Sequence, residues 1–344
     1  MPELRANESA SGGGGGGAAS AVVKRVVSVS LGSSRRDKIT TARFADQTFE
    51  IQRIGTDGDT ARFRQLLEEL DGRVDAIGLG GLDRYLWAGG RRYEMASARQ
   101  LIRGVRRTPV VDGSGLKDSL ERETVRWLAE NGVVDFAHRN TLMVCGVDRF
   151  GMAEALAEQR GPILFGDLMF NLGVPLAIPS WSAHRRLARL LLPVLTRLPI
   201  ALLYPTGQKQ NEITPKWERY YRWADVIAGD FLLIGRFLPG AGAGAPAPLA
   251  GKTILTNTTR PADVEELEKR GVSLLVTTTP EFEGGSFGTN VMEGVLIALN
   301  GGQKLSPEGY LATLKQLGWT PNVRRLRGSG KSEKESRACN DSPS

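Results

Sequence analysis

The sequence has few of the side chains on which disulfide scaffolds and metal centres depend. Among its 344 residues there are only two cysteines and two histidines. Cys145 lies in an apolar run and Cys339 in a polar tail, which excludes a disulfide framework and predicts a reducing, cytoplasmic location. His138 and His184 are too few for a His-rich metal site, so we expect no bound metal.

Long apolar runs are also missing. The first 20 residues contain charges and a glycine run instead of the apolar core of a signal peptide. The most apolar stretch, Leu187 to Pro205, is interrupted by two arginines and two prolines, whereas a membrane-spanning helix needs about 20 apolar residues in succession. We expect a helical hairpin here and no stable membrane insertion. A lipid- or polyprenyl-handling protein that uses this hairpin is one alternative.

The chain is basic but lacks the pattern of a nucleic-acid platform. It has 45 Lys and Arg against 38 Asp and Glu. The basic residues are spread out, in pairs such as Arg106-Arg107 and Arg185-Arg186, without interleaved aromatic residues. We therefore expect an anionic small molecule as partner and no nucleic acid, and a homo-oligomer is compatible with this sequence.

Strands and helices alternate along the chain, which is typical of an α/β fold. A strand from Arg25 to Ser30 is followed by a hairpin from Ile39 to Ile54, and an almost wholly apolar strand begins at Thr141. The sequence predicts two α/β domains, of which the C-terminal one is Rossmann-like with a mostly parallel sheet and an apolar helical insert. The expected divisions are a tail at 1–22, an N-terminal substrate domain at 23–138, a Rossmann-like domain at 139–324 with its insert at about 180–222, and a tail at 325–344.

The stretch VCGVDRFGMAEAL resembles the G-x-G-x-x-G fingerprint of dinucleotide-binding turns. Gly146 and Gly151 occupy the first and last glycine positions, between a strand and a helix, and Asp167 stands about 20 residues further on, where the fingerprint has an acid for the ribose. An acid at that place favours NAD over NADP. Arg149 would offset phosphate charge.

Asp148 occupies the position of the middle glycine. A carboxylate about 4 Å from a phosphate costs on the order of 4 kcal/mol at an effective dielectric constant of 20. Asp148 is also a preferred N-cap residue, whose side chain would satisfy the helix N–H groups in place of a phosphate. The sequence leaves a nucleotide site and a plain capped turn both open.

Loops rich in glycine, aspartate and hydroxyl groups follow several other predicted strands. Ligands of open α/β folds bind at the carboxyl ends of strands, so these loops supply pocket candidates. In the N-terminal half the candidates are Asp57, Asp83, Arg84, Asp112, Ser114 and Lys117. In the C-terminal half they are Thr258 and Gly288 for a cofactor and Asn290 for a substrate. Lys117, next to a carboxylate, has the chemistry to move the proton of an alcohol.

Several segments together resemble bacterial proteins labelled quinate 5-dehydrogenase. They are RVVSVSLGSS, IGTDGD, GLGGLDRYLWAGGRRY, TPVVDGSGLKDSLER, DRFGMAEAL, YPTGQKQ, WADVIAGD and TTTPEFEGGSFGTNVMEG, and the resemblance covers roughly residues 24–324. It implies a substrate domain, a Rossmann domain, and oxidation of a ring hydroxyl with NAD or NADP by a Lys-Asp pair. That pair would be Lys117 with Asp57, from the GTDG stretch, or with Asp112.

The main hypothesis is therefore an NAD(P)-dependent alcohol dehydrogenase for a carboxylated polyhydroxy ring such as quinate or shikimate. The alternative is a non-redox, Rossmann-like protein that binds or senses an anionic small molecule.

Overall fold

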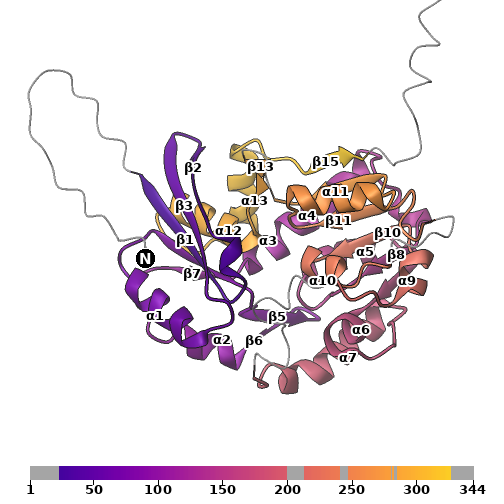
Figure 1. Cartoon of the computed structure of the whole chain (residues 1–344), viewed down its shortest axis with the longest axis horizontal. Helices are drawn as coiled ribbons and strands as arrows, with labels where there is room; N and C mark the ends of the chain where they lie inside the picture. The colour runs from indigo at the N-terminus through magenta and orange to yellow at the C-terminus, as the bar shows by residue number, and fades with distance from the viewer. Residues whose placement is uncertain (1–22, 200–212, 241–246, 280, 283–284, 327–344) are drawn as a thin grey trace, which may run out of the picture.

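The computed structural model describes residues 23–199, 213–240, 247–279, 281–282 and 285–326. The predicted tail at 1–22, most of the predicted tail at 325–344, and the end of the predicted hairpin at 187–205 lie outside the described residues. The described chain is a mixed α/β structure with two sheets, and helices pack on both faces of each (Figure 1). The predicted α/β class and its two α/β layers are confirmed.

The first sheet has five strands in the order β2-β3-β1-β4-β7. They are β1 (Lys24–Ser30), β2 (Lys38–Phe44), β3 (Gln47–Gly55), β4 (Ala76–Gly80) and β7 (Val110–Val111). All pair in parallel except β2, which runs antiparallel to β3 and confirms the predicted hairpin. Successive side chains of a strand point to opposite faces, so Val26 packs in the core on one face of this sheet and Val27 in the core on the other.

The second sheet has six strands in the order β15-β12-β11-β10-β8-β9. They are β8 (Thr141–Met143), β9 (Ile163–Phe165), β10 (Val226–Gly229), β11 (Thr253–Thr256), β12 (Leu274–Thr277) and β15 (Asn322–Arg325). Only β15 is antiparallel to its neighbour. The short strands β8 and β10 are almost wholly buried, as their apolar sequences predict for a sheet covered on both faces.

Helices from distant parts of the chain cover the first sheet. One face packs against α1 (Thr60–Leu70) and α2 (Ala96–Leu101). The other packs against α12 (Thr289–Leu299) and α13 (Pro307–Gln316), which follow β12 of the second sheet along the chain. In Figure 1 these gold helices lie beside the indigo strands of the N-terminus. The chain thus returns from the second sheet to the first before it adds β15.

The second sheet is covered by α4 (Leu120–Glu130) and α5 (Phe150–Glu158) on one face. The other face carries α6 (Asp167–Leu172), α9 (Glu218–Trp223), α10 (Phe231–Arg236) and α11 (Pro261–Lys269). The remaining short elements are η1 (Ser34–Arg36), β5 (Tyr85–Ala88), β6 (Arg91–Glu94), α3 (Ser114–Asp118), η2 (Phe136–His138), β13 (Glu281–Phe282) and β14 (Gly285–Ser286).

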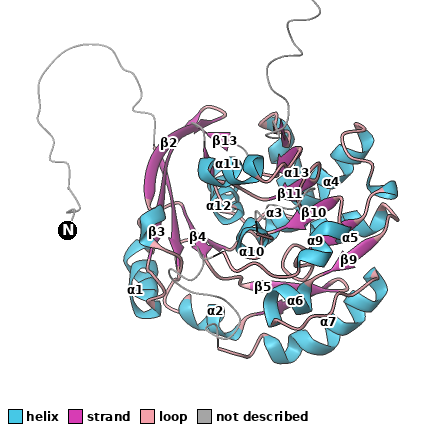
Figure 2. Cartoon of the chain, turned by 45° about the vertical axis from the view of Figure 1, so that its right-hand side comes forward, coloured by secondary structure: helices cyan, strands magenta, loops and turns pink. Residues whose placement is uncertain are grey.

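One amphipathic helix, α7 (Trp181–Leu195), joins the two halves. It lies beside α6 at the lower edge of the molecule, close to β5 (Figure 2). Ala188 and Leu192 complete the core of the first half, whereas Leu187 packs in the core of the second. The apolar segment of the sequence is therefore a helix between two layers, as far as the described residues extend.

Candidate functional site

A cavity of about 820 Å³ lies between the two sheets. Its lining includes the last residue of β1 and residues that follow β4, β8, β10 and β11, so it opens at the carboxyl ends of parallel strands in both sheets. In the first sheet β1 lies between β3 and β4, and in the second β8 lies between β9 and β10. The strand order reverses at these places, which is where open α/β sheets bind their ligands. Both reversal points face one cavity.

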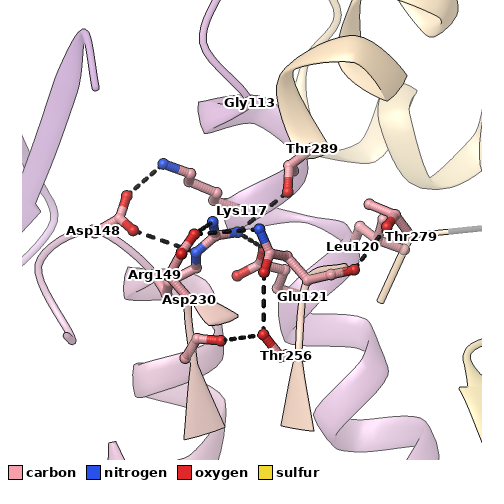
Figure 3. Close-up of polar contacts among 12 residues, drawn as sticks. Gly113, Lys117, Leu120, Glu121, Asp148, Arg149, Asp230, Thr256, Thr279 and Thr289 are labelled. Atoms are coloured by element: carbon pink, nitrogen blue, oxygen red, sulfur yellow. Dashed lines mark hydrogen bonds and ion pairs between the residues drawn. The ribbon is translucent and has the colours of Figure 1, made fainter. Parts of the chain in front are cut away.

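Lys117 lies at the centre of a buried ion-pair network at one end of this cavity. Its Nζ donates to Asp83 Oδ1 at 2.5 Å. It also donates to Asp148, as Figure 3 shows. Asp83 follows β4 of the first sheet and Asp148 follows β8 of the second, so the lysine ties the two halves together. Burial alone would lower the pKa of Lys117, but the two carboxylates raise it above its usual value. Lys117 is therefore protonated at physiological pH.

The two carboxylates that contact Lys117 have opposite protonation behaviour. Burial, together with the charge of Asp148, raises the pKa of Asp83 to about 7. Burial would also raise the pKa of Asp148, but Lys117 and Arg149 lower it well below its usual value. Asp148 is thus an anion at every physiological pH, while Asp83 gains or loses a proton near neutrality.

Arg149 extends the network toward the second sheet. Its guanidinium pairs with Glu121 and Asp230, donates to Thr289 Oγ1 at 3.2 Å, and lies 3.3 Å from Asp148 Oδ2 (Figure 3). Burial raises the pKa of Glu121 to about 7, although the Arg149 cation opposes this shift. We call the six side chains Lys117, Arg149, Asp83, Asp148, Glu121 and Asp230 the ion-pair network.

Asp167 holds the turn after β8 from inside the protein. Its carboxylate accepts hydrogen bonds from the backbone N–H groups of Gly146 at 3.1 Å and Val147 at 3.0 Å, and it lies 3.0 Å from His184 Nε2. His184 is stacked on Phe165, with 4.5 Å between the ring centroids. The backbone donors that would hold a pyrophosphate in a dinucleotide-binding turn are therefore occupied by a carboxylate of this chain.

A second buried network adjoins the cavity at Asp112. Asp112 accepts from the backbone N–H groups of Arg84 at 2.7 Å and Tyr85 at 3.1 Å. Glu293 on α12 accepts from Gly113 N–H at 2.6 Å and from the Tyr310 hydroxyl at 2.7 Å. Burial raises the pKa of Glu293 to about 7. These contacts fix the turn that leads into α3 and hence the position of the lysine on that helix.

A cluster of cations forms one wall of the cavity. We call it the basic wall, and its members are Arg35, Arg36, Lys38, Arg53 and Arg260. The first four come from the first sheet, whereas Arg260 precedes α11 of the second half. Burial lowers the pKa of Arg36, and repulsion by Arg53 and Arg260 lowers it further. Burial and Arg53 likewise lower the pKa of Lys38. The positive charges of this wall thus repel one another, and they come from both halves of the molecule.

Carboxylates of the described residues pair with some of these cations. Arg53 pairs with Asp37 at 2.9 Å, and Arg260 pairs with Asp263 at 2.6 Å. Close by, α12 begins at Gly288 without a side-chain cap, so the positive end of its dipole faces the same cavity.

The opposite wall is apolar. We call it the apolar wall, and its members come from α6, α7 and α10: Leu168, Leu172, Leu187, Leu191, Leu195, Leu232 and Leu233. Leu172 and Leu232 remain 39% and 38% exposed although they line the cavity. The site therefore combines a buried ion-pair network, a basic wall and an apolar wall.

The structure brings together many but not all of the predicted site residues. The predicted residues that line the cavity are Asp83, Asp112, Lys117, Asp148, Arg149, Asp167, Thr258, Gly288 and Asn290. Those that do not line it are Asp57, Arg84, Ser114, Gly146 and Gly151. The structure thus brings many of the predicted residues together at strand ends, but in other contacts than those predicted.

The predicted Lys-Asp pair is not formed. Asp57 is exposed and accepts from Ser34 N–H at 3.0 Å, with no contact to Lys117. Asp112 is engaged by backbone N–H groups and by Ser114 Oγ at 2.6 Å. The predicted substrate residue Arg84 instead pairs with Glu94 at 3.0 Å.

The VCGVDRFG stretch does not form the predicted capped turn, and a nucleotide site there stays a prediction. Asp148 caps no helix, because α5 begins after Arg149 without a side-chain cap, and its carboxylate pairs with Lys117 instead. Gly146 makes room for His184, since a Cβ there would lie 2.9 Å from the imidazole ring. A Cβ at Gly151 would collide with the backbone carbonyl groups at the end of α3. Both glycines serve close packing of the protein with itself.

Sequence reasoning missed the whole basic wall, as well as Glu121, His184 and Asp230. The SSRRDK segment directly after the first strand was the available signal, since it places two arginines at a strand end. Glu121 was hidden on the buried face of a helix where an apolar residue is the norm.

The chain belongs to the family described as Domain of unknown function (DUF8754), whose model matches residues 115–326. A second family, Domain of unknown function (DUF8753), matches residues 25–112. No curated protein matches the chain.

Among solved structures, the chain is similar to three solute-binding proteins. An ABC transporter periplasmic solute-binding protein from Actinobacillus succinogenes 130z, with bound D-allose, is 15% identical, with 88% of this chain and 97% of that chain covered and a TM-score of 0.34. The periplasmic binding protein of the arabinose ABC transporter from Shewanella sp. ANA-3 is 8% identical, with 85% and 95% covered and a TM-score of 0.32. A possible leucine/isoleucine/valine-binding protein from Rhodopirellula baltica SH 1 is 12% identical, with 90% and 91% covered and a TM-score of 0.32.

These comparisons correct the proposed family. The matching family models are DUF8754 and DUF8753, so the predicted membership of the quinate 5-dehydrogenases is wrong. The predicted oxidoreductase for quinate or shikimate, which depended on that membership, is wrong with it. NAD or NADP as a cofactor and a cytoplasmic location stay predictions.

Within the described residues, no helix is both long and apolar enough to cross a membrane. In the same part of the chain, no group of three or more His, Cys, Asp or Glu side chains is arranged to hold a metal ion.

Proposed function

We propose that this protein binds a small molecule with at least two negative charges in the cavity between its two α/β layers, without a redox reaction. The basic wall carries this proposal. Its cations come from both halves of the molecule and converge on one cavity. A bound anion would therefore contact both layers at once.

The local charges favour a dianion over a single carboxylate. Among the described residues, the basic wall has five cations, and the carboxylates close enough to act on them are Asp37, Asp57, Asp230 and Asp263. Asp230 is already paired with Arg149, so positive charge is in excess at this wall. Guanidinium groups also match the oxygen geometry of phosphate, which they bind with two parallel hydrogen bonds. A phosphate or diphosphate group fits this wall best.

The strand order supports a ligand at this place. We infer that the second sheet is Rossmann-like in the broad sense of a doubly wound sheet, because β9-β8-β10-β11-β12 follows the order 2-1-3-4-5 of flavodoxin-like proteins. The carboxyl ends of β8 and β10 then form the expected ligand crevice, and the cavity is located there.

Titration calorimetry of the full chain with inorganic phosphate and pyrophosphate tests the proposal. Pyrophosphate should bind more tightly than phosphate, and at 100 times its Kd it should raise the free energy of unfolding by about 2.7 kcal/mol. The variants Arg36→Met and Arg260→Met should each weaken binding about 10- to 100-fold, because a hydrogen bond to a charged group contributes about 1.5–3 kcal/mol. Arg139→Met, at an exposed site away from the cavity, is the matched control.

No binding of either anion, or equal losses in Arg36→Met and Arg139→Met, would contradict the proposal. NAD and NADP belong in the same panel. Because Asp167 occupies the backbone donors of Gly146 and Val147, we expect any dinucleotide to bind through the basic wall and not through the turn after β8.

A further inference from the structure

The cavity extends well beyond the anion site. From the basic wall it continues along α10 to α7 and α6, where the side chains of the apolar wall line it. The two regions adjoin at Asp230, which precedes α10 and lies close enough to Arg36 to raise its pKa against the larger effect of burial. The next two residues, Phe231 and Leu232, already line the apolar part. A ligand held at the basic wall thus has an apolar channel directly beside it.

Leucine side chains predominate in the apolar part, although Asp167, Asn171, His184 and Arg236 also line the cavity. Asp167 there accepts two backbone hydrogen bonds, and the Asn171 amide lies 3.0 Å from Cys145 Sγ. Leu172 and Leu232, in contrast, present roughly a third or more of their surfaces. Exposed apolar surface that lines a cavity marks a place for an apolar ligand group.

We propose that the bound anion carries a hydrocarbon chain, so that the ligand is an alkyl or isoprenyl phosphate whose head lies at the basic wall and whose chain lies along the apolar wall. This inference rests on the proposed function. Charge complementarity places the head, and the single continuous cavity places the chain. The shared chemistry is a phosphate on a hydrocarbon chain, whether it comes from a membrane lipid or from a soluble metabolite.

The affinity should depend on chain length. Burial of one methylene group stabilises a complex by about 0.8 kcal/mol, which is close to a fourfold decrease in Kd. Calorimetry with inorganic phosphate and with butyl, hexyl, octyl and decyl phosphate, each below its micelle concentration, measures this dependence. We expect Kd to fall by up to about 15-fold for every two carbons, until the chain fills the channel.

Substitutions on α7 and α10 locate the chain. Leu191→Gln and Leu232→Gln, each in the apolar wall, should reduce the gain per methylene. Leu190→Gln is the matched control, because Leu190 lies on the same helix, is 73% exposed and does not line the cavity. The control should keep the full chain-length dependence. Two variants on different helices guard against one that fails to fold.

The outcomes separate this inference from the function on which it rests. If phosphate and pyrophosphate bind but longer chains add nothing, the hydrocarbon chain is refuted and the anion site stands. If no anion binds, the proposed function itself fails. A chain-length gain that is equal in all three leucine variants places the chain elsewhere and also overturns the inference.

A vesicle experiment distinguishes the two sources of such a ligand. The full chain is mixed with phosphatidylcholine vesicles that contain about 10% phosphatidic acid as the anionic lipid. The vesicles are then removed by centrifugation. Phosphatidic acid that stays in solution with the protein, and is lost in Leu191→Gln, supports a lipid ligand. If no phosphatidic acid is extracted but octyl phosphate binds tightly, the result supports a soluble ligand. Protein that sediments equally in Leu191→Gln and Leu190→Gln indicates mere surface adsorption and contradicts the inference.

Discussion

Removal of the Lys117 ammonium should reveal how firmly the ion-pair network joins the two halves. The side chain of Lys117 is only 4% exposed and contacts one carboxylate from each half, Asp83 and Asp148. Methionine has nearly the same shape but no charge. In Lys117→Met the two carboxylates face each other without this cation, and breaking a buried ion pair by the loss of one partner costs about 3–5 kcal/mol.

The size of the loss should depend on pH. Because Lys117 lowers the pKa of Asp83, that pKa should rise above about 7 in Lys117→Met, so the variant keeps losing stability above pH 7, where the parent protein no longer does. We therefore expect a loss near 3 kcal/mol at pH 6 and a larger loss at pH 8. In the double variant Lys117→Met/Asp83→Asn the second carboxylate is replaced by an amide, so the loss should shrink and no longer depend on pH.

Urea denaturation at both pH values, followed by fluorescence, measures these differences. Lys315→Met, at an exposed lysine on α13, is the control and should change the free energy of unfolding by less than about 0.5 kcal/mol. A loss below about 1 kcal/mol in Lys117→Met, or the same loss in the single and the double variant, would refute the reasoning.

Two other predictions concern the buried acids and the helix packing. The carboxyl groups of Asp83, Glu121 and Glu293 have pKa values of about 7 in the folded protein, whereas unfolded acids release their protons near pH 4. Between about pH 4 and 7 the folded state holds more protons, so stability should fall across this window and level off above it. Glu293→Gln should make the fall smaller in a series of urea midpoints, and an unchanged profile would count against this assignment. Gly151→Ala should destabilise by about 1–3 kcal/mol, because its Cβ would collide with backbone carbonyl groups of α3. Gly240→Ala, where a Cβ meets nothing within 4 Å, is its control, and equal midpoints would contradict the packing role.

The sequence predicted the local elements well because their signals are local. The hairpin from Ile39 to Ile54 has alternating side chains around a short turn, and it forms as β2 and β3. The unit from Thr141 onward also forms, with β8 and β9 parallel and α5 between them. Asp167, two residues after β9, already belongs to α6.

The partners within the site were less predictable because they are distant in the sequence. Lys117 was correctly placed near a carboxylate at a strand end, but its partners lie 34 and 31 residues away, in loops of different sheets. Asp148 was considered only as a helix cap or as an obstacle to a phosphate, both of which are local roles. A buried lysine from another loop was a third possibility that no spacing within VCGVDRFG reveals.

The position of the charges also explains why a ligand would bind in one orientation. In the ion-pair network four carboxylates surround two cations, so this end of the cavity repels anions unless two of its acids are protonated. At the basic wall the balance is reversed, because five cations lie beside Asp37, Asp57 and Asp263, and the nearby Asp230 is already paired with Arg149. An anion is therefore driven to one end of the cavity by attraction there and repulsion at the other. Because the network already joins the two halves, an anion between Arg36 and Arg260 would form a second connection, and ligand binding should stabilise the two layers against each other as well as each layer alone.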